Sequence, residues 1–264
     1  MARIIGIVSG KGGVGKTTLT INLGSALSKF FNKKVTVVDC NITTSHLGLY
    51  LGLYYSPITL NKVLRGESSI EEAVYDYFTG MKVVPASLSV SELEGVDITL
   101  LRESLKPLED KNDIILLDGS PGLGREAMAC LKACNEVLYV TSPYVPSVID
   151  IVKYQEVVNE LNLKPIGIVL NAVDRARYEM NVKEVEELVR LPVLASIPYD
   201  KNIKKALAAK IPVVILNKNS PASREMIKFA ARLVGEEYRP ESSFSRIMER
   251  LRSFMSLRKS LGPV

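Results

Sequence analysis

Short apolar runs separated by segments with helical periodicity repeat along most of this chain. The runs consist mainly of β-branched residues and leucine, with little alternation of polar and apolar positions. This pattern is typical of parallel strands that are covered on both faces. Strands are therefore expected at residues 4–8, 34–38, 82–84, 113–117, 136–140, 165–170 and 193–197.

The segments between these runs place apolar residues at intervals of three and four, which predicts helices. The predicted helices are residues 19–27, 96–108, 125–133, 147–161, 183–190 and 203–209, and a last one that starts at Ser220-Pro221 and ends near Tyr238. The hydroxyl of Ser220 suits a helix cap, and Pro221 suits a first helical turn. Alternating strands and helices predict an α/β fold: a doubly wound, mostly parallel sheet with helices on both faces.

Such sheets bind ligands at the carboxyl ends of their strands. The first predicted strand is followed there by a glycine-rich turn with the spacing G-x-x-x-x-G-K-[ST], and then by a helix, as a phosphate-binding loop requires. The loop comprises Gly10, Lys11, Gly12, Gly13, Val14, Gly15, Lys16 and Thr17, with Thr18 next in the helix. Its backbone N–H groups and the helix N-terminus suit phosphate oxygens. Lys16 would reach the β- and γ-phosphates of ATP, or the β-phosphate of ADP, and Thr17 would bind Mg²⁺. The alternative is an ordinary glycine-rich turn, but such a turn does not require Lys16 and Thr17 at these positions.

Two further strands end in an aspartate. Asp39 follows the run 34–38, and Asp118 follows the run 113–117. Because the ends of parallel strands meet at one edge of a sheet, we expect both carboxylates beside Thr17 at the Mg²⁺ site. A buried structural carboxylate is the alternative for Asp39. Gly122 follows Asp118 at the D-x-x-x-G spacing, which predicts that its N–H reaches a γ-phosphate.

The order Lys-Gly-Gly-Val-Gly-Lys-Thr-Thr at residues 11–18 resembles the deviant phosphate-binding loop of the ParA/MinD ATPases. The resemblance extends from residue 4 to about residue 233 and is strongest to MinD-like proteins. It implies an ATP-dependent homodimer in which Lys11 crosses the interface to the partner's nucleotide, whereas a solvated lysine is the alternative. It also implies that Asn171 recognises adenine, with Pro198 and Asp200 in the base-binding loop. A loop-capping asparagine is the alternative there.

Two segments resemble the family's switches but depart from its usual residues. Residues 41–52 resemble the first switch, yet the chain reads Asp39-Cys40-Asn41 where MinD relatives usually read Asp-x-Asp. In the family the second aspartate helps to position the attacking water. Asn41 can hydrogen-bond a water but carries no charge. Hydrolysis is therefore expected to be slow, or another group orients the water. Residues 118–124 resemble the second switch, with Pro121 one place later than usual.

The chain is predicted to divide into an ATPase domain at 1–238, a linker at 239–243 and a helix at 244–261. One face of that helix is apolar, with Phe244, Ile247, Met248, Leu251, Phe254 and Met255. Residues 242–264 contain five basic residues and one acidic residue, against a net charge of +5 for the whole chain. A basic amphipathic helix suits an anionic membrane surface, and MinD proteins carry one. The alternatives are that this helix docks on its own domain or that it binds a partner protein.

Other features limit the possible functions. No apolar run is long enough for a transmembrane helix, and no signal peptide precedes the first strand. A cytoplasmic protein, peripherally associated with the inner face of the cell membrane, is expected. Cys40, Cys130 and Cys134 have no metal-ligand spacing. Cys130 and Cys134 could share a helix face and are expected to be buried as small apolar residues.

The resulting prediction is a MinD-like ATPase that dimerises on ATP–Mg²⁺, binds the membrane as a dimer and is released on hydrolysis. Its predicted catalytic residues are Lys11, Lys16, Asp39, Asn41 and Asp118. An unidentified regulatory or effector protein would recognise the ATP-bound dimer, in cell division or in positioning. A ParA-like DNA-partition ATPase needs a basic stripe, and the nearly neutral domain makes DNA an unfavoured partner. A metal-cluster carrier of the Mrp type does not fit the cysteine spacing. A non-hydrolysing ATP-gated adaptor remains an alternative function, because Asn41 stands where the family usually has the second aspartate.

Overall fold

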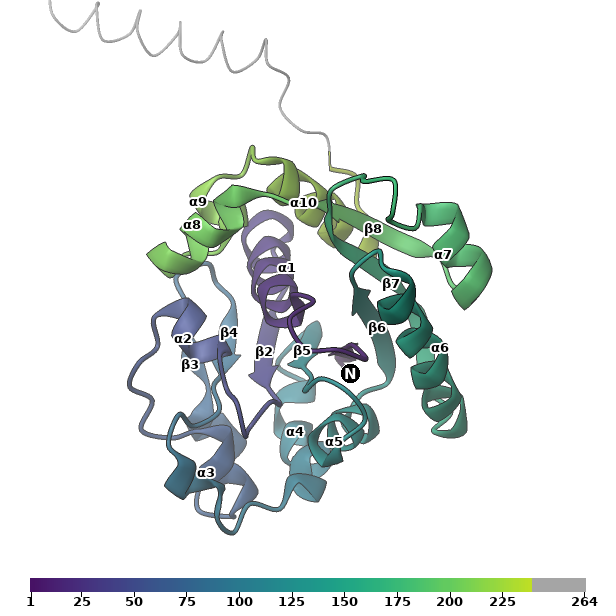
Figure 1. Cartoon of the computed structure of the whole chain (residues 1–264). Helices are drawn as coiled ribbons and strands as arrows, with labels where there is room; N and C mark the ends of the chain where they lie inside the picture. Colours follow the sequence, from purple (N-terminus) through teal and green to yellow (C-terminus); the bar gives the residue numbers. More distant parts are fainter. Residues whose placement is uncertain (239–264) are drawn as a thin grey trace, which may run out of the picture.

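The apolar runs form one sheet in the computed structural model, which describes residues 1–238 (Figure 1). The strands are β1 (Arg3–Val8), β2 (Val35–Asp39), β3 (Tyr75–Asp76), β4 (Lys82–Val84), β5 (Ile114–Asp118), β6 (Glu136–Thr141), β7 (Lys164–Val173) and β8 (Val193–Pro198). Their spatial order is β3-β4-β2-β5-β1-β6-β7-β8. Only β3 runs antiparallel to its neighbour β4 among these strands. The predicted doubly wound, mostly parallel sheet is confirmed.

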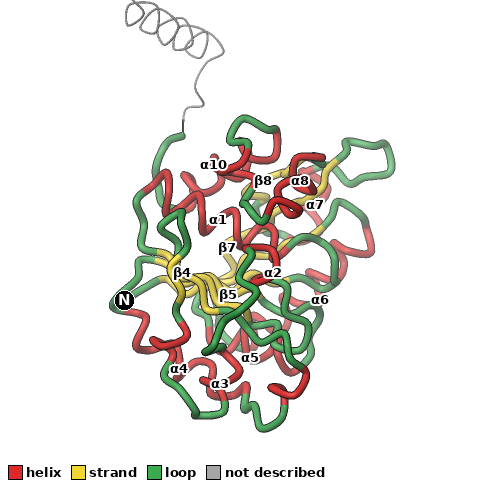
Figure 2. The backbone as a smooth tube through the Cα atoms, turned by 90° about the vertical axis from the view of Figure 1, so that its left-hand side faces the viewer, coloured by secondary structure: helices red, strands yellow, loops and turns green. Residues whose placement is uncertain are grey.

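Helices cover both faces of this sheet (Figure 2). They are α1 (Lys16–Phe31), α2 (Leu47–Leu51), α3 (Leu60–Leu64), α4 (Leu101–Glu109), α5 (Arg125–Ala133), α6 (Val145–Glu160), α7 (Val182–Val189), α8 (Lys201–Ala209), α9 (Val213–Leu216) and α10 (Pro221–Leu233). The helices α1, α2 and α8 to α10 pack on one face, and α3 to α7 pack on the other. None of these helices is long and apolar enough to cross a membrane.

Successive strand residues alternate between two apolar cores. In β1, Ile5 and Ile7 pack toward α1, whereas Ile4 and Val8 face the opposite core, and all four side chains are fully buried. Burial on both faces explains why the strands are continuously apolar. Cys130 and Cys134 are buried, as predicted; Cys40 is buried as well, and all three are free thiols.

Two glycines allow α5 to approach the centre of the sheet. A Cβ on Gly6 of β1 would lie 2.9 Å from Cys134 Sγ, and one on Gly119 would lie 3.3 Å from Cys130 Sγ. Larger residues at either glycine would displace α5, which begins just after the second switch segment. The close packing therefore fixes one end of that segment against β1 and β5.

Some predicted helix boundaries were wrong. The helix expected at 96–108 begins only at Leu101, because Asp97 accepts a hydrogen bond from the Thr99 N–H at 3.0 Å and starts a 3₁₀ turn instead. The last helix ends at Leu233 rather than near Tyr238. Gly235 follows with φ 70°, a left-handed conformation that stops the helix. Its predicted start is confirmed, since the Ser220 side chain accepts from the Ser223 N–H.

The short elements β3, α2, α3 and α9 were missed, because elements of two to five residues show too little periodicity. The linker predicted at 239–243 and the amphipathic helix predicted at 244–261 lie outside the described residues.

Candidate functional site

The glycine-rich loop connects β1 to α1, as predicted, and its glycines are required by geometry. Gly13 and Gly15 have φ values of 77° and 95°, which L side chains rarely adopt. A Cβ on Gly15 would lie 2.2 Å from Asn171 Nδ2, and one on Gly10 would lie 2.3 Å from Asp150 Cβ in α6. These two glycines therefore let β7 and α6 approach the loop. Gly12 and Val14 complete the turn.

Lys16 lies inside this loop, with only 7% of its surface exposed. Its Nζ donates to Ser9 Oγ at 2.8 Å, and Ser9 Oγ in turn donates to the Lys11 carbonyl at 2.7 Å. Burial lowers the pKa of Lys16, and the nearby charge of Asp118 partly opposes that effect. A buried ammonium bonded to a neutral hydroxyl would gain strongly from an anionic ligand, as the phosphates of ATP would provide.

Asp39 and Asp118 lie side by side, because β2 and β5 pair with these two residues in register. Their exposed fractions are 0% and 1%. Burial and the charge of Asp118 raise the pKa of Asp39 to about 7, and burial raises the pKa of Asp118 to about 6. The Thr17 and Thr20 hydroxyls donate to Asp118, Thr20 Oγ1 at 3.1 Å. Two buried carboxylates that repel one another form a favourable environment for a dication.

The donors at this point suit Mg²⁺. Carboxylate and hydroxyl oxygens from Asp39, Asp118 and Thr17 converge there, as the sequence predicted. Within residues 1–238, no group of three or more His, Cys, Asp or Glu side chains is placed to hold a metal ion. A Mg²⁺ ion bound here would take its other ligands from phosphates and water, as Mg²⁺ does in many phosphate-transfer sites.

Asp39 also orders the first switch segment. It accepts hydrogen bonds from the Ser45 hydroxyl at 2.7 Å, from the Asn41 N–H at 3.1 Å and from the Leu47 N–H at 3.3 Å. Any ligand that binds Asp39 will therefore act on residues 41–47. The carboxylate thus connects the predicted metal site with the first switch.

Asn41 lies between the two switch segments. Its Nδ2 donates to the Thr44 carbonyl at 2.9 Å, and its Oδ1 accepts from Thr44 Oγ1 at 3.0 Å and lies 3.1 Å from Ser120 Oγ. Ser120 belongs to the second switch segment, and its single hydroxyl hydrogen is donated to the Glu126 carboxylate in α5, the stronger of the two acceptors. Sequence reasoning missed Ser120 and Glu126. The only available signal was a carboxylate in the first turn of a helix that follows a switch.

Gly122 was predicted to direct its N–H toward a γ-phosphate. In the structure that N–H donates to the Ser9 carbonyl at 3.0 Å, and Gly122 has φ 71°. The second switch segment is therefore hydrogen-bonded to Ser9, which directly precedes the phosphate-binding loop. The predicted contact to a γ-phosphate requires the Gly122 N–H to exchange this partner.

Asn171 joins β7 to the phosphate-binding loop. Its Nδ2 donates to the Val14 carbonyl at 2.7 Å, whereas its Oδ1 is buried and has no hydrogen-bond partner. A buried acceptor without a partner is costly, so this atom fits a ligand donor such as the exocyclic amine of adenine. The unpartnered oxygen is compatible with the predicted adenine contact, which would then use the acceptor of the amide; the contact stays a prediction.

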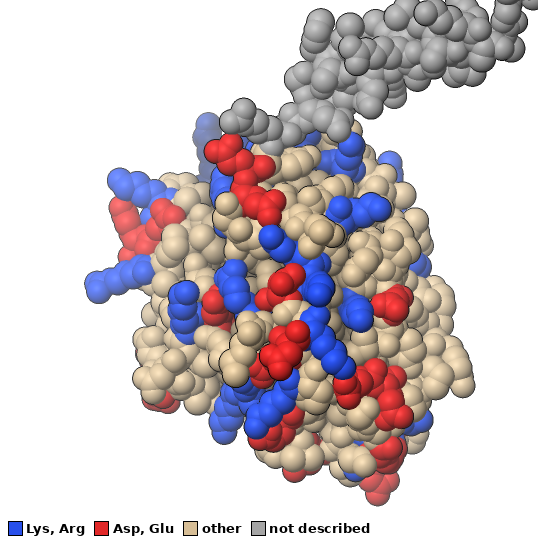
Figure 3. Space-filling model, turned by 180° about the vertical axis from the view of Figure 1, so that it is seen from behind, with Lys and Arg blue, Asp and Glu red and all other residues tan. Residues whose placement is uncertain are grey.

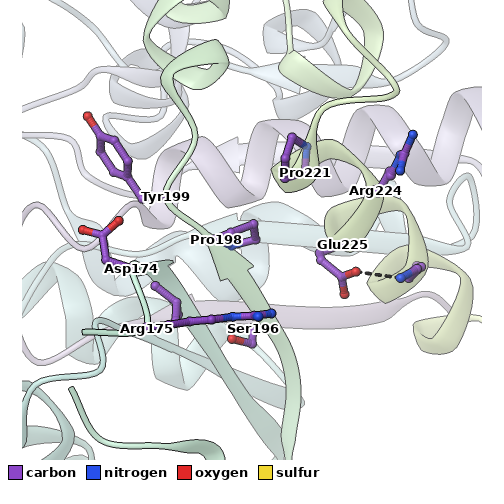
Figure 4. Close-up of a pocket in the computed structure, with 10 residues that line it drawn as sticks. Asp174, Arg175, Ser196, Pro198, Tyr199, Pro221, Arg224 and Glu225 are labelled. Carbon is purple, nitrogen blue, oxygen red and sulfur yellow. Dashed lines mark hydrogen bonds and ion pairs between the residues drawn. The ribbon is translucent and has the colours of Figure 1, made fainter. Parts of the chain in front are cut away.

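Pro198 and Asp200 differ in their surroundings. Pro198 lines an open pocket of about 680 Å³, between the loop with Asp174 and Arg175 and the helix α10 (Figure 4). The other lining residues are Val173, Ser196, Tyr199, Pro221, Arg224, Glu225 and Lys228. Asp200 instead caps α8, where its Oδ1 accepts from the Asn202 N–H at 2.8 Å and its Oδ2 accepts from the Ala222 N–H of α10 at 3.2 Å.

Lys11 belongs to the loop but lies at the surface. Its side chain is 47% exposed, and its Nζ is 3.8 Å from Asp150 Oδ2 in α6. The two lysines of the loop therefore differ: Lys16 occupies the interior of the loop, whereas Lys11 is accessible from outside the chain.

Comparisons with known proteins agree with this geometry. The family model described as the CobQ/CobB/MinD/ParA nucleotide binding domain matches residues 5–213. An uncharacterized ATP-binding protein of Methanocaldococcus jannaschii is 36% identical over 238 residues, which are 90% of each chain.

Two solved structures are similar over nearly the whole described region. The cell division ATPase MinD of Pyrococcus furiosus has a TM-score of 0.86 and 36% identity, covering 89% of this chain and 99% of that one. The septum site-determining protein MinD of Pyrococcus horikoshii, in complex with Mg-ADP, has a TM-score of 0.85 and 34% identity, covering 88% of this chain and 96% of that one. The chain thus has the fold of these proteins.

Proposed function

This chain belongs to the CobQ/CobB/MinD/ParA nucleotide-binding family as a MinD-like ATPase, and from this premise we propose that it is an ATP-dependent membrane switch. It binds ATP with Mg²⁺, dimerises, associates with an anionic membrane and leaves the membrane after hydrolysis. The observation that carries the proposal is the pair of loop lysines, with Lys16 buried inside the loop and Lys11 accessible to a second subunit.

The described residues suit Mg²⁺-nucleotide binding. Lys16 and the loop N–H groups bind the phosphates, Asn171 Oδ1 accepts from the adenine amine, and Thr17 and the two aspartates hold the ion. When bound, Mg²⁺ neutralises charge on the phosphate oxygens. The complex of the Pyrococcus horikoshii MinD with Mg-ADP supports this assignment.

Dimerisation on ATP follows from the position of Lys11. An ion pair at 3.8 Å between half-exposed groups contributes well under about 1 kcal/mol, so Lys11 is free to exchange Asp150 for a stronger anion. A phosphate group of a nucleotide bound to a second subunit is such an anion. ADP lacks the γ-phosphate, so the dimer dissociates after hydrolysis.

Membrane binding rests on the sequence of residues 244–261, which lie outside the described residues. One basic amphipathic helix is a weak anchor, but a dimer presents two and gains avidity of roughly 10²–10⁴ without any new contact. ATP thereby recruits the protein, and hydrolysis releases it. A regulatory or effector protein that recognises the ATP-bound dimer completes the switch, in cell division or positioning, as the name of the Pyrococcus furiosus relative suggests.

One second candidate is favoured by a specific observation. Both polar atoms of the Asn41 amide are engaged within the protein, which favours a non-hydrolysing ATP-gated adaptor. DNA partition is less favoured, since basic and acidic side chains lie interspersed on the face shown in Figure 3 rather than in a basic stripe.

Liposome co-sedimentation tests the proposal. The full chain is incubated with anionic phosphatidylglycerol vesicles and ATP–Mg²⁺ or ADP–Mg²⁺, beside a variant truncated after Tyr238. We expect sedimentation only with ATP and only with the C-terminal segment. Lys11→Ala should abolish it, because that variant binds ATP as a monomer. Equal sedimentation with ATP and ADP would refute the nucleotide switch, and no sedimentation in either state would refute membrane binding.

A further inference from the structure

The reaction proposed above needs a group that orients the attacking water, and Asn41 is poorly placed for that task. Its Nδ2 is bound to the Thr44 carbonyl, and its Oδ1 accepts the Thr44 hydroxyl hydrogen. Ser120 Oγ lies 3.1 Å from the same Oδ1, but the single hydrogen of that hydroxyl is donated to the Glu126 carboxylate, the stronger acceptor. A water could therefore reach only the second lone pair of Oδ1, on the side that Ser120 Oγ occupies. Asn41 also carries no charge. In the described structure it therefore mainly connects the switch segments.

Asn41 and a nearby carboxylate, that of Glu126, both contact Ser120 Oγ. Glu126, in the first turn of α5, accepts hydrogen bonds from the Ser120 hydroxyl, from the Thr43 hydroxyl and from the Thr43 N–H, the last at 3.1 Å. Thr43 belongs to the first switch segment and Ser120 to the second. Glu126 is thus bonded to both switches at once, although it belongs to neither.

These groups share a cavity of about 550 Å³ between the two switch segments. Asn41, Thr43 and Ser120 line it together with Glu126, which is the only acidic residue among the described residues that line the cavity. A carboxylate has about four lone-pair sites, and the three bonds above leave capacity for a further donor. The first turn of a helix also favours a negative charge electrostatically.

We propose that Glu126 supplies the carboxylate that Asn41 lacks and acts as a positioning residue for ATP hydrolysis. It binds Thr43 and Ser120 and holds the two switch segments together, so that the Ser120 hydroxyl and the Asn41 amide keep a fixed orientation toward the attacking water. Glu126 takes no proton in this role. The inference rests on the proposed ATPase function and identifies a residue that this function requires.

The charge of Glu126 is central to this role. Hydrogen bonds to an ionised carboxylate are roughly twice as strong as those to a neutral group. One carboxylate oxygen of Glu126 accepts from Thr43 and the other accepts from Ser120. A glutamine has an NH₂ group in place of one of these oxygens, so in the same orientation it can accept from only one of the two residues. The Glu126→Gln variant should therefore keep the fold but loosen the contact between the switches.

The test compares Glu126→Gln with a matched variant, Glu103→Gln. Glu103 also lies in the first turn of a helix, α4, and pairs with Lys106 at the surface, far from the loop in the sequence. Steady-state ATP hydrolysis gives kcat and KM, a fluorescent ATP analogue gives affinity, and light scattering gives the ATP-dependent dimer. We expect Glu126→Gln to lower kcat about tenfold or more, with KM, affinity and dimer within about twofold of the native chain. Glu103→Gln should change none of these.

A rescue variant separates positioning from a structural effect. Asn41→Asp returns a carboxylate to the first switch, where it can accept from the Ser120 hydroxyl. In the Glu126→Gln background, Asn41→Asp should recover most of the lost kcat. A purely structural role for Glu126 would not be rescued at residue 41.

The outcomes distinguish this inference from the function on which it rests. An unchanged kcat in Glu126→Gln would overturn the role of Glu126 while leaving the ATPase intact. Parallel losses of kcat, affinity and dimer, or a failed rescue, would show that Glu126 is structural and would also overturn it. If the native chain binds ATP but does not hydrolyse it, the hydrolytic function itself fails, and the inference fails with it.

Discussion

Replacing Gly15 by alanine tests how closely β7 supports the phosphate-binding loop. Gly15 has φ 95°, and a Cβ there would lie 2.2 Å from Asn171 Nδ2. The Asn171 side chain would have to leave its position. It would then lose the hydrogen bond of 2.7 Å to the Val14 carbonyl.

Two costs combine in this variant. The left-handed backbone costs an alanine about 1–2 kcal/mol, and the lost hydrogen bond costs about 0.5–1.5 kcal/mol. We therefore expect the free energy of unfolding of the nucleotide-free protein to fall by about 1.5–3.5 kcal/mol. ADP–Mg²⁺ affinity should also fall, because we propose that Asn171 Oδ1 accepts a hydrogen bond from adenine.

Urea denaturation measures the first effect, and titration calorimetry with ADP–Mg²⁺ measures the second. Gly13→Ala is the matched control, since Gly13 has φ 77° but nothing lies within 4 Å of its added Cβ. That variant should lose only the backbone contribution, about 1–2 kcal/mol. The difference between the two variants isolates the contact with Asn171.

A double-mutant cycle provides the decisive comparison. Once Asn171→Ala has removed the amide, Gly15→Ala should cost about as much as Gly13→Ala, so the two changes are not additive. Additive losses, or equal losses for Gly13→Ala and Gly15→Ala in the native background, would refute the argument that Asn171 restricts residue 15.

Three further predictions test other parts of the site. Lys11→Ala should bind ATP but remain monomeric by light scattering, with its free energy of unfolding changed by less than about 0.5 kcal/mol, because the ion pair is half-exposed. Without nucleotide and Mg²⁺, the folded protein should bind more protons than the unfolded chain between about pH 4 and 7, since the pKa values of Asp39 and Asp118 are raised to about 7 and about 6. Its melting temperature should therefore fall as the pH rises through that range, and less so in Asp39→Asn; a melting temperature that rises instead would contradict the raised pKa values. Asp200→Ala should lower the free energy of unfolding in urea by about 1–2 kcal/mol through loss of the α8 cap. Its ADP affinity should fall as well if Asp200 also contacts the base, and should stay unchanged if Asp200 only caps the helix.

The sequence was most informative where a residue acts through its backbone position. The loop glycines, Asp39 and Asp118 could be placed because strand ends in a parallel sheet must meet at one edge. The pairing of Asp39 with Asp118 in register is a direct result of that rule. The bounds predicted for α5 are those observed, and the bounds predicted for β1 and β5 differ by one residue, because apolar runs and helical periodicity mark these elements in the sequence.

Side-chain partners could not be predicted in this way. The link from Glu126 to Thr43 and Ser120 joins residues 83 and 6 positions apart, and no periodicity records it. The sequence also could not show that the Asn171 donor is used by Val14, which leaves only its acceptor for a ligand. Both facts depend on rotamers that tertiary packing selects.

Ser9 connects three groups that the proposed ATP switch needs. Its hydroxyl accepts from Lys16 Nζ and donates to the Lys11 carbonyl, while its own carbonyl accepts from the Gly122 N–H. A γ-phosphate would compete with Ser9 for Lys16 and for Gly122, since a charged acceptor forms the stronger hydrogen bond with each donor. ATP binding would thus exchange internal contacts for contacts to the ligand and release the second switch segment from the loop. ADP lacks the γ-phosphate, so its binding would leave the Gly122 contact in place, and the proposed switch would then respond to the γ-phosphate.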